Sequence, residues 1–178
     1  MKIKSGNNNN ICKKKGNEVM PFIGVIADEK NENFIRREIV EKLKLRESSV
    51  LFIKEKSIEN IKNIKFETIV IARKFKNMEM LKKMLVNTNY LVVNTDRIKN
   101  LEIFKEYDLK IYTFGFNSKA VITASSVSED GILICVGKEI EKIGGGIIEP
   151  QEIKVNTDEE AESVMTVACI LLIYGVEI

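Results

Sequence analysis

The side chains that usually perform covalent catalysis are scarce in this sequence. Its 178 residues include three cysteines and no histidine. Ser125, Ser126 and each cysteine therefore lack the imidazole base that activates a serine or cysteine nucleophile. The cysteines are far apart and have no CxxC spacing, which argues against a zinc site and favours buried free thiols; they are Cys12, Cys135 and Cys169. Only lysine and carboxylate bases remain as candidates for acid–base chemistry.

A second candidate feature is the polar sequence Asn94-Thr95-Asp96, which follows the apolar run 90–93. Asp96 has the position of an N-cap for a helix over residues 97–105, and Asn94 ends a strand. Capping accounts for Asp96 without a ligand, while ligand binding by both side chains is the alternative interpretation. The triplet Gly144-Gly145-Gly146 is not followed by a helix start, so we interpret it as a hairpin connection and not as a phosphate-binding loop.

The elements that would position these residues alternate between residues 22 and 115. Short runs of β-branched residues, typical of strands buried on both faces, alternate with segments of helical periodicity. The pattern predicts an α/β fold with a mainly parallel sheet flanked by helices. The predicted strands cover residues 22–27, 50–53, 68–72, 90–93 and 111–115, and the helices begin near residues 34 and 78, the second capped by Asn77.

The pattern changes after residue 115. Extended segments at 120–128 and 132–136 flank Glu129-Asp130-Gly131, which is typical of a tight hairpin. A further strand over 147–155, with Pro150 at a bend or an edge, completes a small antiparallel subsheet in the C-terminal half. Thr157 and Glu160 have the spacing of a capping box for an apolar, deeply buried helix from Asp158 to about Tyr174.

Composition indicates a single domain over residues 21–178, preceded by a flexible basic arm over residues 1–20. The formal net charge is only +2, which argues against nucleic acid as a partner. The longest apolar stretch, 164–174, is too short to cross a bilayer about 30 Å thick. We expect a cytoplasmic protein that makes no contact with a membrane.

Four features, taken together, resemble the central domain of the Mur ligase family, the ATP-dependent enzymes that add amino acids to the peptidoglycan precursor. They are Asn94-Thr95-Asp96, Thr113-Phe114-Gly115, the hairpin at Asp130-Gly131 and the helix that ends in Gly175-Val176, in that order. The resemblance implies a P-loop NTPase-like domain. It also implies that Asn94 and Asp96 lie near the adenine of a bound nucleotide, although the second Asp of the usual motif is Arg97 here.

The same resemblance puts the family's phosphate-binding loop on residues 27–32, which read Ala-Asp-Glu-Lys-Asn-Glu. The glycines, the lysine and the hydroxyl that such a loop needs are all missing from their positions. Asp28, Glu29 and Glu32 would each repel a nearby phosphate charge by about 1 kcal/mol in water and about 4 kcal/mol in a partly buried site. Lys30 alone cannot offset three carboxylates, so a triphosphate in the family's pose is disfavoured.

Two further expectations of the resemblance concern metal binding. The family binds magnesium through a Glu and a His, and this chain has no His. Lys82 or Lys83 lies where the family often has a carbamylated lysine, but a solvated helix face is the better interpretation of both. The sequence therefore predicts no metal site.

Two functional hypotheses follow. Under the first, the protein is not an enzyme. It is a non-catalytic Mur-ligase-like domain without a cofactor, which acts as a binding, regulatory or scaffold module through self-association or an unknown protein partner. The alternative is a subunit of an ATP-dependent acid–amino acid ligase of the cell-wall precursor type, completed in trans, with a weak residual adenine-nucleotide site at Asn94 and Asp96. A third hypothesis, nucleic-acid binding through the Lys-rich arm, lacks an aromatic stacking pattern.

Overall fold

Eight strands form one mixed sheet in the computed structural model, which describes residues 21–56, 58–61 and 63–178. The strand order is β10-β7-β6-β5-β4-β3-β1-β2. From β2 to β6 every neighbouring pair is parallel, whereas β7 and β10 add antiparallel pairs at one edge. These strands are β1 (Ile23–Ile26), β2 (Val50–Phe52), β3 (Thr68–Ile71), β4 (Tyr90–Asn94), β5 (Lys110–Phe114), β6 (Ile122–Ser128), β7 (Gly131–Val136) and β10 (Gln151–Val155).

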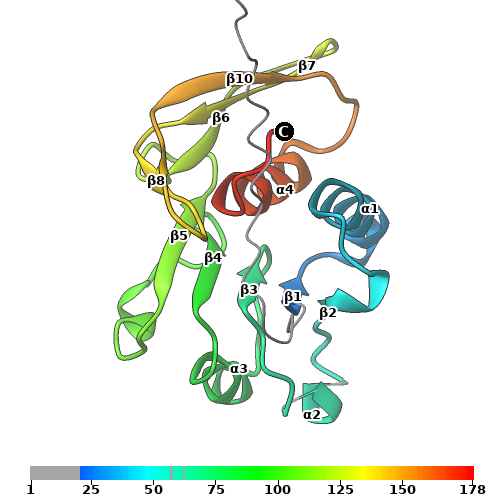
Figure 1. Cartoon of the computed structure of the whole chain (residues 1–178), viewed down its shortest axis with the longest axis vertical. Coiled ribbons are helices and arrows are strands. Elements are labelled where there is room, and N and C mark those ends of the chain that lie inside the picture. The colour runs from blue at the N-terminus through cyan, green and yellow to red at the C-terminus, as the bar shows by residue number, and fades with distance from the viewer. Residues whose placement is uncertain (1–20, 57, 62) are drawn as a thin grey trace, which may run out of the picture.

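Helices cover both faces of the sheet, which makes the fold α/β as predicted (Figure 1). One face carries α1 (Glu32–Leu43) and α4 (Ala161–Ile173), which contact each other, and the other carries α2 (Ile58–Ile61) and α3 (Met78–Leu85). Short 3₁₀ helices occur at η1 (Glu29–Asn31), η2 (Glu47–Ser49) and η3 (Glu102–Phe104). The outer strands β6, β7 and β10 arch over α4, so this helix is enclosed on several sides (Figure 1).

The two faces of the central strands belong to two separate hydrophobic clusters. Val70 and Val92 pack with α1 and α4, whereas Ile69, Ile71 and Leu91 pack with α2 and α3. Successive side chains on a strand point to opposite faces, so a strand between two helical layers must be apolar throughout. This explains why unbroken apolar runs identified these strands in the sequence.

The C-terminal half also agrees with the predicted hairpins. The antiparallel pairing of β6 with β7 confirms the turn at Asp130-Gly131. Gly144, Gly145 and Gly146, all with positive φ angles, connect β8 (Ile140–Glu141) to β9 (Ile147–Ile148) in a separate two-stranded sheet. The predicted strand over 147–155 is divided by Glu149-Pro150, because proline cannot supply the backbone donor that a continuous strand would use.

Two predicted helix starts were wrong, because the side chains expected to cap these helices bond elsewhere. No α-helix follows Asp96: residues 95–97 form a turn, and the helical structure nearby is the short η3. The helix expected from Asp158 begins at Ala161, and Thr157 accepts a hydrogen bond from Glu159 N at 3.1 Å. Glu160 is the N-cap residue of α4, but its side chain caps nothing and contacts Lys30 instead.

In the described part of the chain, no helix has the length and apolar character needed to span a bilayer. The expected basic arm at residues 1–20 lies outside the described residues.

Asn77 does cap α3, as predicted, since its side chain accepts a hydrogen bond from Met80 N at 3.1 Å.

Candidate functional site

The residues singled out in the sequence meet at the carboxyl edge of the parallel strands. The register aligns Ile26 with Ile71 and Ile71 with Val93, and it pairs Asn94 with Phe114. The turns that follow β1, β3, β4 and β5 therefore lie along one edge of the sheet. Open α/β sheets bind ligands at this edge, particularly where the strand order reverses, as it does here beside β1.

Asn94 is 1% exposed and all of its polar atoms are bonded within the chain. Its Nδ2 donates to Ala72 O at 3.3 Å and to Glu162 Oε1 at 2.9 Å. Its Oδ1 accepts from Asp96 N at 2.9 Å. The side chain thus joins β4 to β3 and to the first turn of α4.

Asp96 is held in the same way by the loop that follows β5. Its Oδ2 accepts from Phe116 N at 2.6 Å, and its Oδ1 accepts from Asn117 Nδ2 at 3.0 Å. A Cβ atom placed on Gly115 would lie 2.7 Å from Asp96 Oδ2, well inside van der Waals contact. Glycine at position 115 is therefore required for the close approach between this loop and the Asp96 carboxylate.

The turn after β1 is rich in charges that pair with other segments. Lys54, which follows β2, lies 3.1 Å from Glu29 Oε1 and 3.4 Å from Glu32 Oε1. The hydrogen bond and charge of Lys54 lower the pKa of Glu29, and the reciprocal contacts raise the pKa of Lys54. Lys30 does not offset these carboxylates, because it pairs with Glu160 at the start of α4. The cation that does is Lys54, which sequence reasoning did not consider.

Glu160 and Glu162, at the start of α4, lie across this edge. Glu160 accepts hydrogen bonds from Lys30 and, at 3.3 Å, from Asn31 Nδ2, so it contacts the turn that leads into α1. Glu162 contacts the end of β4: besides Asn94 it binds Arg97, with the Arg97 Nη2 atom 2.7 Å from Glu162 Oε2. These two carboxylates at the start of α4 thus form ion pairs and hydrogen bonds with cationic and amide groups at both ends of the candidate site.

Two cavities open at this edge. One, of about 500 Å³, lies at the ends of β1, β2 and β3, and the other, of about 400 Å³, lies at the ends of β4 and β5. The first contains both signs of charge; its lining residues are Ala27, Glu29, Glu32, Lys54, Glu55, Lys56, Arg73 and Lys76. The second contains two lysines and no carboxylate. Arg73 is fixed in the first cavity by donating from Nε to Ala27 O at 3.0 Å.

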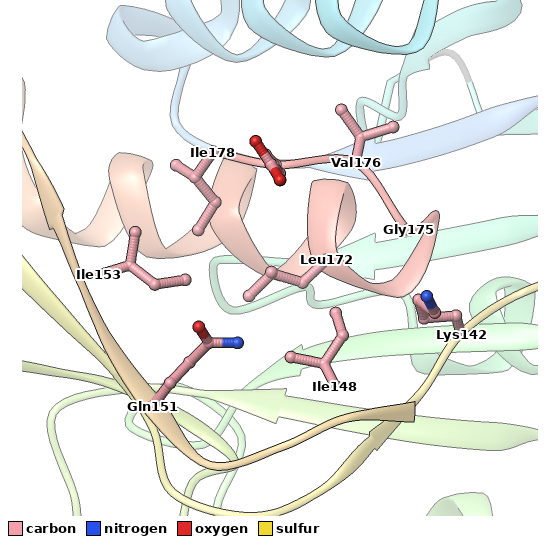
Figure 2. Close-up of a pocket in the computed structure, with 9 residues that line it drawn as sticks. Lys142, Ile148, Gln151, Ile153, Leu172, Gly175, Val176 and Ile178 are labelled. Carbon is pink, nitrogen blue, oxygen red and sulfur yellow. The ribbon is translucent and has the colours of Figure 1, made fainter. Parts of the chain in front are cut away.

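Two further cavities lie away from this edge, on either side of the chain terminus. In Figure 2 the side chains of Ile148, Ile153 and Leu172 surround a pocket of about 410 Å³ between α4 and the β9–β10 segment. The second has about 480 Å³ between α1, α4 and β10. Ile178 lines both cavities.

Metal and thiol chemistry receive little support from the described residues. Among them no group of three acidic, cysteine or histidine side chains is placed to hold a metal ion. Lys82 and Lys83 pair with Glu106 at 3.2 Å and Glu79 at 3.1 Å on the exposed side of α3. Cys169 is fully buried, and burial raises the pKa of its thiol, which keeps the thiol protonated and unreactive.

No family model and no curated protein matches this chain. Sequence reasoning identified Asn94 and Asp96 at a strand end, but it missed their partners Glu162 and Asn117, and it missed Glu160 as the partner of Lys30 and Asn31. The acidic residues 158–160 before α4 were a visible signal, which the capping-box interpretation of Thr157 and Glu160 left unused.

Proposed function

We propose that this chain is a non-catalytic Mur-ligase-like domain that acts as a binding, regulatory or scaffold module. One observation carries the proposal: Glu160 and Glu162 of the C-terminal helix lie at the edge where a nucleotide would bind and already pair with its basic and amide side chains. A triphosphate at the start of α1 would have to displace these carboxylates or lie beside them.

The charge balance supports the same conclusion. A P-loop holds phosphate with glycine backbone N–H groups and a lysine, and here the turn carries Asp28, Glu29 and Glu32 with Lys30 paired elsewhere. Each carboxylate near a phosphate costs about 1 kcal/mol in water and up to about 4 kcal/mol in a partly buried site. Lys54 offsets part of this repulsion, but its ammonium group is already shared by Glu29 and Glu32.

A graft experiment tests the proposal together with the alignment behind it. The triple variant Ala27→Gly, Asn31→Lys and Glu32→Thr restores the three missing loop functions, and adding Glu160→Gln removes the carboxylate that faces them. We expect the quadruple variant to bind ATP with Mg²⁺ measurably, and the native chain not to do so, in isothermal titration calorimetry. A folded variant with no gain in affinity would argue that residues 27–32 are not the counterpart of a phosphate loop.

Self-association is the form of scaffolding that the structure supports best. β10 pairs only with β7 among the described strands, so its other side offers unpaired backbone groups. An antiparallel pairing of two copies of β10 centred on Ile153 would place Glu152 of each copy opposite Lys154 of the other. Such cross-strand pairs of opposite charge are favourable, by roughly 0.2–1 kcal/mol each.

A charge-swap series measures this association. Lys154→Glu should weaken the dimer in sedimentation equilibrium, because it places two carboxylates opposite each other twice per dimer. The double variant Glu152→Lys with Lys154→Glu restores opposite charges and should restore the dimer. Equal association of the native chain, the single variant and the double variant would exclude this pairing.

The second candidate function is the ligase subunit with a residual adenine site. The observation that favours it is the position of Asn94 and Asp96 together at the carboxyl edge of the sheet, where parallel α/β sheets bind ligands. The test is a titration with adenosine and with ATP, each with and without Mg²⁺. Adenosine binding that Asn94→Ala abolishes would support a site for the adenine base. Mg²⁺-dependent ATP binding would support the hypothesis of a ligase subunit.

A further inference from the structure

The cavity at the ends of β4 and β5 differs in charge from its neighbour at the ends of β1 to β3. Lys99 and Lys119 line it, and none of its lining residues is acidic. Neither lysine forms an ion pair with any of the residues that the structure describes. Because no carboxylate lines this cavity, the two unpaired ammonium groups beside it form a local excess of positive charge.

The remaining lining groups are suited to binding oxygen atoms. Thr95, Thr113 and Ser118 contribute hydroxyl groups. The Thr95 hydroxyl already donates to Phe114 O at 3.3 Å, whereas the Ser118 hydroxyl has no intramolecular partner among the described residues. Leu101 supplies an apolar wall. The volume of about 400 Å³ is within the range of about 300–1,000 Å³ that is usual for small-molecule sites.

The loop that carries Lys119 is fixed by several hydrogen bonds. Asn117 donates from Nδ2 to Thr95 Oγ1 at 2.6 Å and accepts at Oδ1 from Lys119 N at 3.1 Å. Val121 N donates to Thr113 Oγ1 at 3.0 Å, which holds the other end of the loop on β5. A backbone that is held before the ligand arrives loses little entropy on binding.

We propose that this cavity binds the phosphate group of a small phosphomonoester, with Lys99 and Lys119 as the charged donors and Ser118 as a neutral donor. A phosphate dianion matches two ammonium groups in charge, and ammonium groups bind phosphate as point charges without a demand on geometry. Asn94 and Asp96 serve a different purpose, because their polar groups are already bonded: Asp96 holds the loop through Phe116 N and Asn117, and Asn94 bonds to Ala72 O, Glu162 and Asp96 N. The site is separate from the β1 turn and needs no Mg²⁺.

The neighbouring cavity provides the control. Lys56 and Lys76 line it together with Lys54, Arg73 and three carboxylates, Glu29, Glu32 and Glu55, so most of its positive charge is offset within the cavity itself. Replacing Lys56 or Lys76 by glutamine removes the same charge from the protein as replacing Lys99 or Lys119. The four variants therefore separate a local site from a general effect of net charge.

The experiment is a ¹⁵N–¹H NMR titration of the whole chain with inorganic phosphate, with ionic strength held constant by sodium chloride. We expect saturable shifts at the amides of residues 117–119 and 99. Lys99→Gln and Lys119→Gln should each weaken binding about tenfold, since a charge-assisted hydrogen bond contributes enough free energy for a factor of that size. Lys56→Gln and Lys76→Gln should leave the affinity unchanged.

Glycerol 3-phosphate, titrated in the same way, should shift the same amides and compete with inorganic phosphate. Shifts that do not saturate, or that persist unchanged in Lys99→Gln and Lys119→Gln, would overturn the proposed site, and failure of the ester to compete would overturn its assignment to phosphomonoesters. These results are distinguishable from a failure of the proposed function, which is decided by Mg²⁺-dependent binding of ATP.

Discussion

Replacing Asn94 by alanine distinguishes most clearly between a structural and a ligand-binding role for this residue. The side chain is almost completely buried and makes three hydrogen bonds, to Ala72 O, Glu162 Oε1 and Asp96 N. A neutral hydrogen bond contributes about 0.5–1.5 kcal/mol net, and one to a charged group about 1.5–3 kcal/mol. We therefore expect Asn94→Ala to lower the free energy of unfolding by about 3 kcal/mol.

Urea denaturation followed by circular dichroism measures this loss. With a slope of about 2–3 kcal/mol per molar urea, the midpoint should fall by about 1–1.5 M. Asn100→Ala is the matched control, because the exposed Asn100 side chain accepts a single hydrogen bond, from Glu102 N at 3.0 Å. We expect it to cost less than about 1 kcal/mol. If Asn94→Ala lowered the free energy of unfolding no more than Asn100→Ala does, the hydrogen bonds of Asn94 would not stabilise this edge of the sheet.

A second substitution at the same position gives the effect a pH dependence. Asn94→Asp puts a buried carboxyl group in place of the amide that donates to Glu162. Burial and the Glu162 charge both raise the pKa of the introduced carboxyl in the folded state. Its unfavourable effect is therefore absent below the unfolded pKa of about 3.9 and grows as the pH rises above it. The stability deficit of Asn94→Asp should be larger at pH 7 than at pH 5, whereas that of Asn94→Ala should stay constant.

Three further predictions concern the packing around the site. Gly115→Ala should lower the free energy of unfolding in urea by about 1–3 kcal/mol, because its Cβ would meet Asp96 at 2.7 Å, whereas Gly137→Ala, with its nearest contact at 3.8 Å, should be nearly neutral; equal effects would contradict the close approach. Tyr174→Phe should cost about 1 kcal/mol by leaving the buried Thr68 hydroxyl without its 2.8 Å partner, and adding Thr68→Val should recover part of the loss in a double-mutant cycle. Burial raises the pKa of Tyr112 from 10.0 to about 12, so the stability that its neutral phenol contributes is complete below pH 10 and is lost between pH 10 and 12. Between pH 10 and 12 the melting temperature should therefore fall less for Tyr112→Phe than for the native chain. Equal falls in melting temperature would refute a role for Tyr112 ionisation.

Most of the sheet could be predicted from the sequence because its causes are local. A strand between two helical layers must be apolar on both sides, and Ile69-Val70-Ile71 shows this in three consecutive residues. The Asn77 cap and the Asp130-Gly131 turn are equally local, since the residues that form each motif lie within a few positions of each other.

The site was less predictable because its contacts join distant segments. Glu162 is 68 positions from Asn94, and Asn117 is 21 positions from Asp96. Sequence spacing predicted that Asp96 would cap its own helix, but the backbone N–H of Phe116 binds the carboxylate from another loop. Such competition between local and distant donors depends on the register of β4 and β5, which spacing alone does not determine.

Titration calorimetry of the full chain with ATP in the presence of Mg²⁺ tests the central claim most directly. The account predicts no Mg²⁺-dependent saturable heat at millimolar ATP, because carboxylates lie where the triphosphate would need positive charge and free backbone donors. Micromolar, Mg²⁺-dependent ATP binding that is lost on reversing the charge of Lys30 or Arg97 would contradict it.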